Sequence, residues 1–182
     1  ACASGKLAPN RDHAFFPSKG WRIETQWMQG RRLSRDDFAD GPIRRFNLQA
    51  QAVRSWGVHT LSALTRLDLS DGVASQIPRY GLGGFQQLSG FAPFQVSGQQ
   101  VALLRLRYQV RLLPAPLTRG TFFGVSWEGG QAWEQRQDFA SARKRTGTSL
   151  YLGADTAVGP VYGAIVHSPG VGATFMVFGG RP

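Results

Sequence analysis

The residue types that most often do chemistry in enzymes are few in this chain and are poorly spaced for it. The stretch 124–128 (Gly-Val-Ser-Trp-Glu) comes nearest to the Gly-x-Ser-x-Gly turn that presents a nucleophilic serine, but it ends in Glu where that turn needs Gly. His13, His59 and His167 lie far apart without the spacing of metal ligands, and no phosphate-binding glycine-rich loop occurs. We therefore expect no catalytic residue, no metal site and no cofactor in this chain.

The charge of the chain is strongly positive and is carried mainly by arginine. The 182 residues hold 21 Lys and Arg against 11 Asp and Glu, and the sequence pI is about 11.0. A nucleic-acid-binding domain gathers its basic residues in one patch, whereas here they are spread over predicted strands and loops. We expect anionic partners such as lipopolysaccharide phosphates, attracted by charge, and no nucleic acid. The single cysteine, Cys2, excludes a disulfide scaffold.

The elements that must position any site are strands, because apolar and polar residues alternate with a period of two along most of the chain. The clearest case is 102–112, where three arginines, Arg105, Arg107 and Arg111, share one face and aliphatic residues share the other. The alternation predicts about eight strands, at 20–30, 46–52, 61–69, 102–112, 119–129, 146–155, 158–167 and 172–179.

The connections between these strands are of two kinds. Short turns are predicted at 56–57, 158–160 and 169–170, and long polar loops at 31–42, 71–98 and 131–145. Strands of about 10 residues joined in this way are typical of outer-membrane barrels, where short turns lie at one end and long loops at the other. The sequence contains no run of 18 apolar residues, so it predicts no membrane-spanning helix.

Alternation by itself does not distinguish a membrane barrel from a soluble β protein. In a soluble protein the apolar face packs into the core, and in a membrane barrel it meets lipid. Two features favour the membrane: polar positions are often small or amide residues, and aromatic residues lie near strand ends, as an interfacial belt requires. These aromatic residues are Trp21, Trp27, Trp56, Tyr80, Trp127, Trp133 and Tyr162.

Three stretches carry a resemblance to one family. The stretch 10–21 contains the strand-opening turn Phe16, Pro17 and Gly20, the stretch 79–91 is rich in glycine, and 126–182 contains a late turn with Asp155, Gly159 and Pro160. In this order they resemble the bacterial surface antigen superfamily of outer-membrane barrels (the BamA/TamA type). The sequence motifs are most similar to those of the carboxy-terminal barrels of patatin-like phospholipases of the neuropathy-target-esterase-like family.

The resemblance implies that the loop at about 71–98 folds back into the barrel lumen. Its motif residues would be Gly83, Gly84, Phe85, Leu88, Ser89, Gly90 and Phe91. Assembly factors of the superfamily carry Arg where this chain has Ser89, and that Arg pairs with an acid on a later strand. Alternation places Glu128 and Gly130 on the polar face, so a Ser89–Glu128 hydrogen bond could replace the ion pair. The alternative is that Ser89 is only a small residue in a crowded loop.

The implied fold is all-β, an antiparallel membrane β-barrel in which residues 1–182 form one domain, the C-terminal half of a sixteen-stranded barrel. Eight strands could also close alone as a small barrel. The implied role is to anchor an attached patatin-like lipase domain in the bacterial outer membrane, or also to secrete or present it. This chain would not itself be an enzyme. The implied partners are membrane lipid and lipopolysaccharide and the attached patatin and polypeptide-transport-associated (POTRA) domains, and a homodimer is left open.

Two alternatives remain open. The first is an outer-membrane protein assembly or insertion factor of the same fold, which an Arg at position 89 would have favoured. The second is a soluble, basic, ligand-binding β-barrel, which should purify without detergent.

Overall fold

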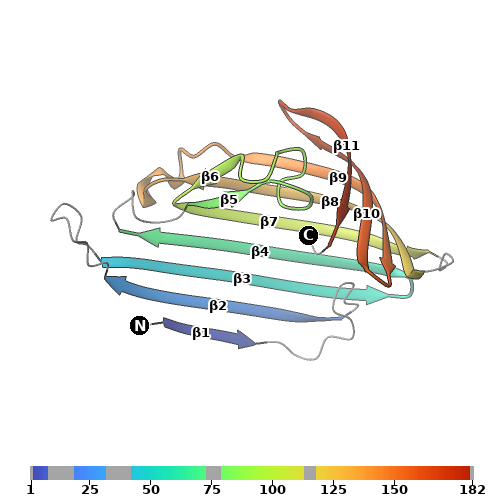
Figure 1. Cartoon of the computed structure of the whole chain (residues 1–182), viewed down its shortest axis with the longest axis horizontal. Coiled ribbons are helices and arrows are strands. Elements are labelled where there is room, and N and C mark those ends of the chain that lie inside the picture. The colour runs from blue at the N-terminus through green and yellow to red at the C-terminus, as the bar shows by residue number, and fades with distance from the viewer. Residues whose placement is uncertain (1, 8–18, 32–41, 73–78, 113–117, 181–182) are drawn as a thin grey trace.

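The computed structural model describes residues 2–7, 19–31, 42–72, 79–112 and 118–180, and its main element is one antiparallel sheet (Figure 1). In spatial order, the nine strands are β1 (Cys2–Leu7), β2 (Lys19–Arg31), β3 (Pro42–Trp56), β4 (His59–Asp71), β7 (Gln100–Leu112), β8 (Thr118–Trp133), β9 (Arg145–Thr156), β10 (Gly159–Ser168) and β11 (Gly172–Gly179). A separate two-stranded ladder joins β5 (Tyr80–Leu82) and β6 (Val96–Gly98).

The prediction of an all-β antiparallel fold is confirmed, and all eight predicted strands are present. The structure has one further strand in the main sheet, β1, whose Ala, Ser and Gly residues give no clear alternation. The predicted loop at 131–145 is too long, because β8 continues to Trp133 and a short 3-10 helix, η2 (Arg136–Phe139), follows. Within the described ranges, no helix is long and apolar enough to cross a membrane.

The sheet is an uninterrupted ladder in which each strand pairs with the next strand of the sheet, but it is open. β1 and β11 form its two edges, and no pairing between them occurs in the part of the chain that the structure describes. The first tight turn lies where it is predicted, since Trp56 pairs with His59 across a turn in which Gly57 has φ +58°. The turn predicted at 158–160 lies one residue earlier, at 157–158, because Gly159 already pairs with Thr156. The eight-stranded count is therefore corrected to nine, and closure into a barrel belongs to the proposal below.

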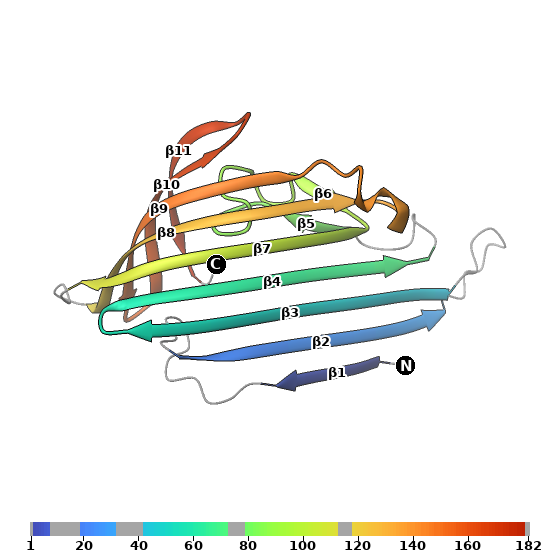
Figure 2. The same cartoon turned by 180° about the vertical axis from the view of Figure 1, so that it is seen from behind.

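Because side chains alternate along a strand, the sheet has two faces of different character. We call the face covered by the segment 79–98 the inner face and the opposite one the outer face. Figures 1 and 2 show this segment, with β5 and β6, lying against one side of the curved sheet only. The sheet curls around it, so that Phe178 on β11 comes within 5.7 Å of Phe85, measured between ring centroids.

The apolar side chains that become buried lie mainly where the segment 79–98 meets the sheet. One cluster consists of Phe85, Phe122, Tyr151, Tyr162, Ala164 and Val166. The other consists of Leu64, Tyr80, Leu82, Leu88, Phe91, Val101 and Leu103. Most other buried inner-face positions are polar or charged, whereas the outer face is uncovered and largely apolar.

Candidate functional site

The segment 79–98 has an irregular, tightly folded backbone on the inner face. Gln86 and Leu88 have positive φ angles of 59° and 75°, an uncommon conformation for residues other than glycine. Gly84 donates a main-chain hydrogen bond to Phe91 O (2.8 Å), which closes the motif into a loop. Inside this loop, Gln86 N–H donates to the Ser89 hydroxyl at 2.9 Å. The structure thus gathers all seven predicted motif residues into one compact loop.

Ser89 is the point where this loop is fastened to the sheet. Its main-chain N–H donates to Oε2 of Glu128 at 3.0 Å, and its carbonyl accepts from the Ser168 hydroxyl at 2.5 Å. Ser126 Oγ donates to the other oxygen of Glu128, and both Ser89 and Glu128 have no exposed surface. The predicted partners Ser89 and Glu128 are therefore in contact, through the main-chain amide of Ser89.

Glycines make room for this contact. A Cβ atom at Gly147 would lie 2.5 Å from Ser89 O and 2.8 Å from Ser89 N, and a Cβ at Gly90 would lie 2.8 Å from Ser168 Oγ. The predicted site residue Gly130 lies under the loop in the same way, since its Cβ would approach Leu82 and Leu88 at 3.1 and 3.3 Å. The loop and the sheet are therefore in backbone-to-backbone contact, which larger side chains would prevent.

We expect Gly147→Ala to weaken the seating of the loop and to destabilise the chain by about 1–3 kcal/mol, the usual cost of overpacking. The added methyl group meets main-chain atoms of Ser89, which cannot move without breaking the bond to Glu128. The matched control is Gly163→Ala on β10, where a Cβ finds only Phe175 at 4.0 Å. Urea unfolding of the two variants measures the difference, and equal midpoints would contradict this close approach.

Aromatic and aliphatic side chains hold the two ends of the loop. Phe85 packs against Tyr151, Tyr162 and Phe178, with ring centroids 5.2–5.7 Å apart. At the other end Phe91 joins the second cluster, and the guanidinium of Arg145 lies 5.6 Å from its ring centroid. Offset and edge-on aromatic contacts of this kind add to the stabilisation that comes from burial.

Two arginines of β7 donate hydrogen bonds from the sheet to the loop. Nη1 of Arg105 donates to Gln86 O (3.2 Å) and Nη1 of Arg107 donates to Gln86 Oε1 (3.4 Å). Both arginines are buried, and the register sets Arg105 directly beside Glu128. Sequence analysis placed both arginines on one face but did not assign them to the loop, because nothing local indicates what covers that face.

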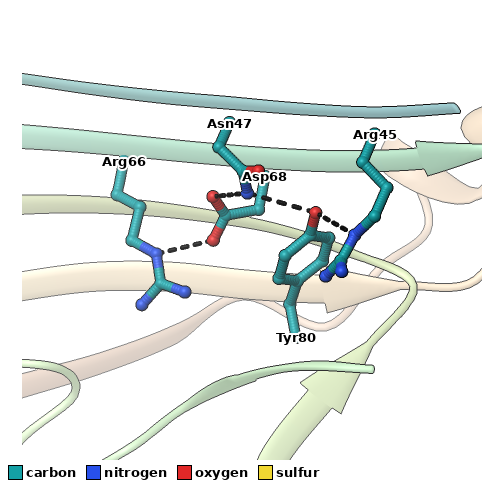
Figure 3. A network of polar contacts seen from close by, with 5 residues as sticks. All are labelled: Arg45, Asn47, Arg66, Asp68 and Tyr80. Atoms are coloured by element: carbon teal, nitrogen blue, oxygen red, sulfur yellow. Dashed lines mark hydrogen bonds and ion pairs between the residues drawn. The ribbon is translucent and has the colours of Figure 1, made fainter. Parts of the chain in front are cut away.

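A second polar network fastens β5 to the sheet (Figure 3). Tyr80 OH accepts from Arg45 Nε (3.0 Å) and from Asn47 Nδ2 (3.1 Å), and Asn47 also donates to Asp68 at 2.7 Å. Arg66 Nε donates to the second oxygen of Asp68 at 2.6 Å. This network was not predicted from the sequence.

The remaining predicted site residues lie elsewhere. Asp155, Gly159 and Pro160 form the ends of the β9–β10 turn, where Gly159 has φ +115°. Gly20 lies in β2 with φ +124°, and its predicted companions Phe16 and Pro17 lie outside the described residues. The structure thus brings the loop motif together with Glu128 and Gly130, but the two turns belong to other parts of the fold.

Comparison with known proteins adds no name to this site. No protein-family model matches the chain, and no curated protein matches its sequence. The features that bear on the class of protein are the two faces of the sheet and the loop that covers one of them.

Proposed function

We propose that the chain is part of an antiparallel β-barrel in the bacterial outer membrane and serves there as a membrane anchor. One observation carries the proposal: the face of the sheet that is covered is the polar one, and the face left uncovered is the apolar one. Residues such as Leu104, Leu106, Leu150, Leu152 and Ile165 are exposed on the outer face. A membrane barrel has this arrangement, and a soluble sheet has the reverse.

The distribution of charge on the outer face supports the proposal further. On β3, Arg44 and Arg54 both point outward, and every outward residue between them is uncharged. Ten residues at about 3.3 Å each span about 33 Å along the strand, which corresponds to about 25 Å of membrane height at the usual strand tilt. This agrees with the apolar band of outer-membrane barrels. Lys19, which pairs with Arg54, bounds the band on β2 at the same end.

The inner face has the character that a barrel lumen requires. It carries charges in the middle of strands, such as Arg66 on β4, Arg105 on β7 and Glu128 on β8. The segment 79–98 covers Arg105 and Glu128 and supplies a hydrogen-bond partner for each of them. A closed barrel would also provide partners for the free edges of β1 and β11, which the bilayer interior would otherwise leave unpaired.

Fluorescence quenching by lipid tests the membrane location. The chain is refolded into phosphatidylcholine vesicles with brominated acyl chains, in two variants that keep a single tryptophan and carry Phe at the other four positions. Trp127 lies exposed on the outer face, and Trp133 is buried against Phe139 with ring centroids 5.0 Å apart. We expect strong quenching of Trp127 and weak quenching of Trp133. Equal quenching, or a chain that stays monomeric in buffer without vesicles, would contradict the proposal.

We further propose that the anchored partner is a patatin-like lipase domain, and this part rests only on the sequence resemblance. The reading frame that encodes the chain tests it. A Gly-x-Ser-x-Gly turn followed by a catalytic Asp in the preceding domain would support a lipase anchor. Tandem POTRA modules without a hydrolase would instead support an assembly factor.

A further inference from the structure

We infer that the inner face binds a small phosphate-type oxyanion between Arg66 and Arg105, beside the segment 79–98. The site is a cavity of about 290 Å³ whose polar lining residues are Arg22, Glu24, Gln49, Arg66, Gln87 and Arg105, and two leucines complete its wall. It adjoins a second polar cavity of about 420 Å³ that shares Arg22, Glu24, Gln49 and Arg66. Both are walled by the inner face of β2, β3 and β4, so together they form one polar groove.

The register of the sheet brings the two arginines together. Arg66 on β4 pairs with Leu103 on β7, and Arg105 is two residues further along β7 on the same face. Such diagonal neighbours are within reach of each other when their side chains are long. Two like charges in this arrangement repel each other unless an anion lies between them.

Both guanidinium groups have hydrogen-bond donors that are not used by the residues the structure describes. Arg66 uses Nε for Asp68, and Figure 3 shows its two terminal nitrogens pointing away from that carboxylate. Arg105 makes its one hydrogen bond to a described residue through Nη1, to Gln86 O, although only 6% of its surface is exposed. A guanidinium has five N–H donors. Each of the two groups can therefore donate to a further acceptor placed in the groove.

The acids of the inner face do not supply these acceptors, because each has other partners. Glu24 pairs with Arg22, Asp68 binds Asn47 and Nε of Arg66, and Glu128 holds Ser89 and Ser126. On the described inner-face strands β2 to β8, these three acids face six arginines: Arg22, Arg45, Arg66, Arg105, Arg107 and Arg111.

This surplus of positive charge selects an anion, and the planar fork of a guanidinium matches two oxygens of a phosphate group. The amide groups of Gln49 and Gln87, at the wall of the cavity, can donate to the remaining oxygens. The site is a property of the inner face alone. It therefore does not depend on whether the outer face meets lipid, and its failure would leave the membrane proposal untouched.

Calorimetric titration with inorganic phosphate tests the inference, using the chain refolded in an uncharged maltoside detergent at about 0.15 M salt, where diffuse attraction is screened. We expect saturable binding at one site. Arg66→Gln should weaken it at least about tenfold, because the fork and its charge are lost together. Arg119→Gln is the matched control: it removes the same charge from an exposed residue at the start of β8 and should change the affinity less than about twofold.

Arg66→Lys provides a second measurement that does not depend on the folding of the Gln variant. It keeps the charge beside Asp68 but lacks the fork, so phosphate should bind more weakly than to the unaltered chain. A parallel titration with dihexanoyl phosphatidic acid distinguishes the source of the ligand. Binding of inorganic phosphate indicates a soluble ligand, and binding of the phosphatidic acid alone indicates a lipid headgroup. Absence of saturable binding in both titrations, or equal weakening by Arg66→Gln and Arg119→Gln, would overturn the inference.

Discussion

Replacing Glu128 by alanine should destabilise the folded chain by about 3–5 kcal/mol, the cost of removing one partner from a buried charged cluster. The substitution takes away the acceptor of the Ser89 N–H and of the Ser126 hydroxyl. It also leaves Arg105, its buried neighbour across the ladder, without a nearby negative charge. Urea unfolding of the chain in detergent micelles measures the stability. Hydrogen exchange of a peptide covering 83–91 measures whether the loop leaves the sheet, and we expect that peptide to lose its protection.

Two further variants identify which atoms hold the loop. Glu128→Gln keeps an oxygen that can accept from Ser89 N–H but removes the charge, so its effect should be smaller than that of alanine. Ser89→Ala keeps the main-chain bond to Glu128 and removes the hydroxyl, which accepts from Gln86 N–H and also interacts with Glu128. We expect a cost of about 1–3 kcal/mol, the range for a hydrogen bond with a charged partner. If Ser89→Ala were as damaging as Glu128→Ala, the hydroxyl and not the amide would hold the loop.

Leu106→Arg should cost about 2–4 kcal/mol when the chain is folded in lipid vesicles, because it places a charge near the middle of the apolar band. Leu106 lies at the centre of β7 on the outer face and is 43% exposed. In a soluble sheet, an Arg at such an exposed position would change the stability by less than about 0.5 kcal/mol. The expected loss of stability therefore differs between a membrane barrel and a soluble sheet. Urea unfolding in vesicles measures the free energy of unfolding and distinguishes the two.

Leu112→Arg is the matched control for this experiment. Leu112 lies on the same strand and the same face and is 42% exposed, but it is the last residue of β7. Near the membrane interface an Arg costs only about 0–1 kcal/mol, because its charged end reaches the headgroups. Equal small effects at both positions would argue that the outer face meets water, and equal large effects would argue that it packs against protein.

The sequence by itself determined the strands and their two faces. Alternation is a local property, because successive side chains of any extended backbone point to opposite sides. The order of residues along β7 and β8 is therefore sufficient to assign the arginines of β7 to one face and the carboxylate of Glu128 to the polar face of its strand. The turn at Gly57 was predicted in place and the turn at 157–158 within one residue, since both are short and join strands that pair directly. Strand β1 was missed because its small residues carry no pattern.

Only the tertiary structure decided which face the segment 79–98 covers and which atoms hold it there. The bond between Ser89 and Glu128 joins residues 39 positions apart, and the bond between Ser168 and Ser89 joins residues 79 positions apart. Gly147 and Gly90 matter only because Ser89 and Ser168, which are distant from them in sequence, come close to them, and nothing in their own neighbourhood along the chain indicates this. Likewise, Arg66 and Arg105 become neighbours only through the register of β4 with β7. Local backbone geometry sets the pattern of each strand, whereas contacts between distant residues depend on the packing of the whole sheet.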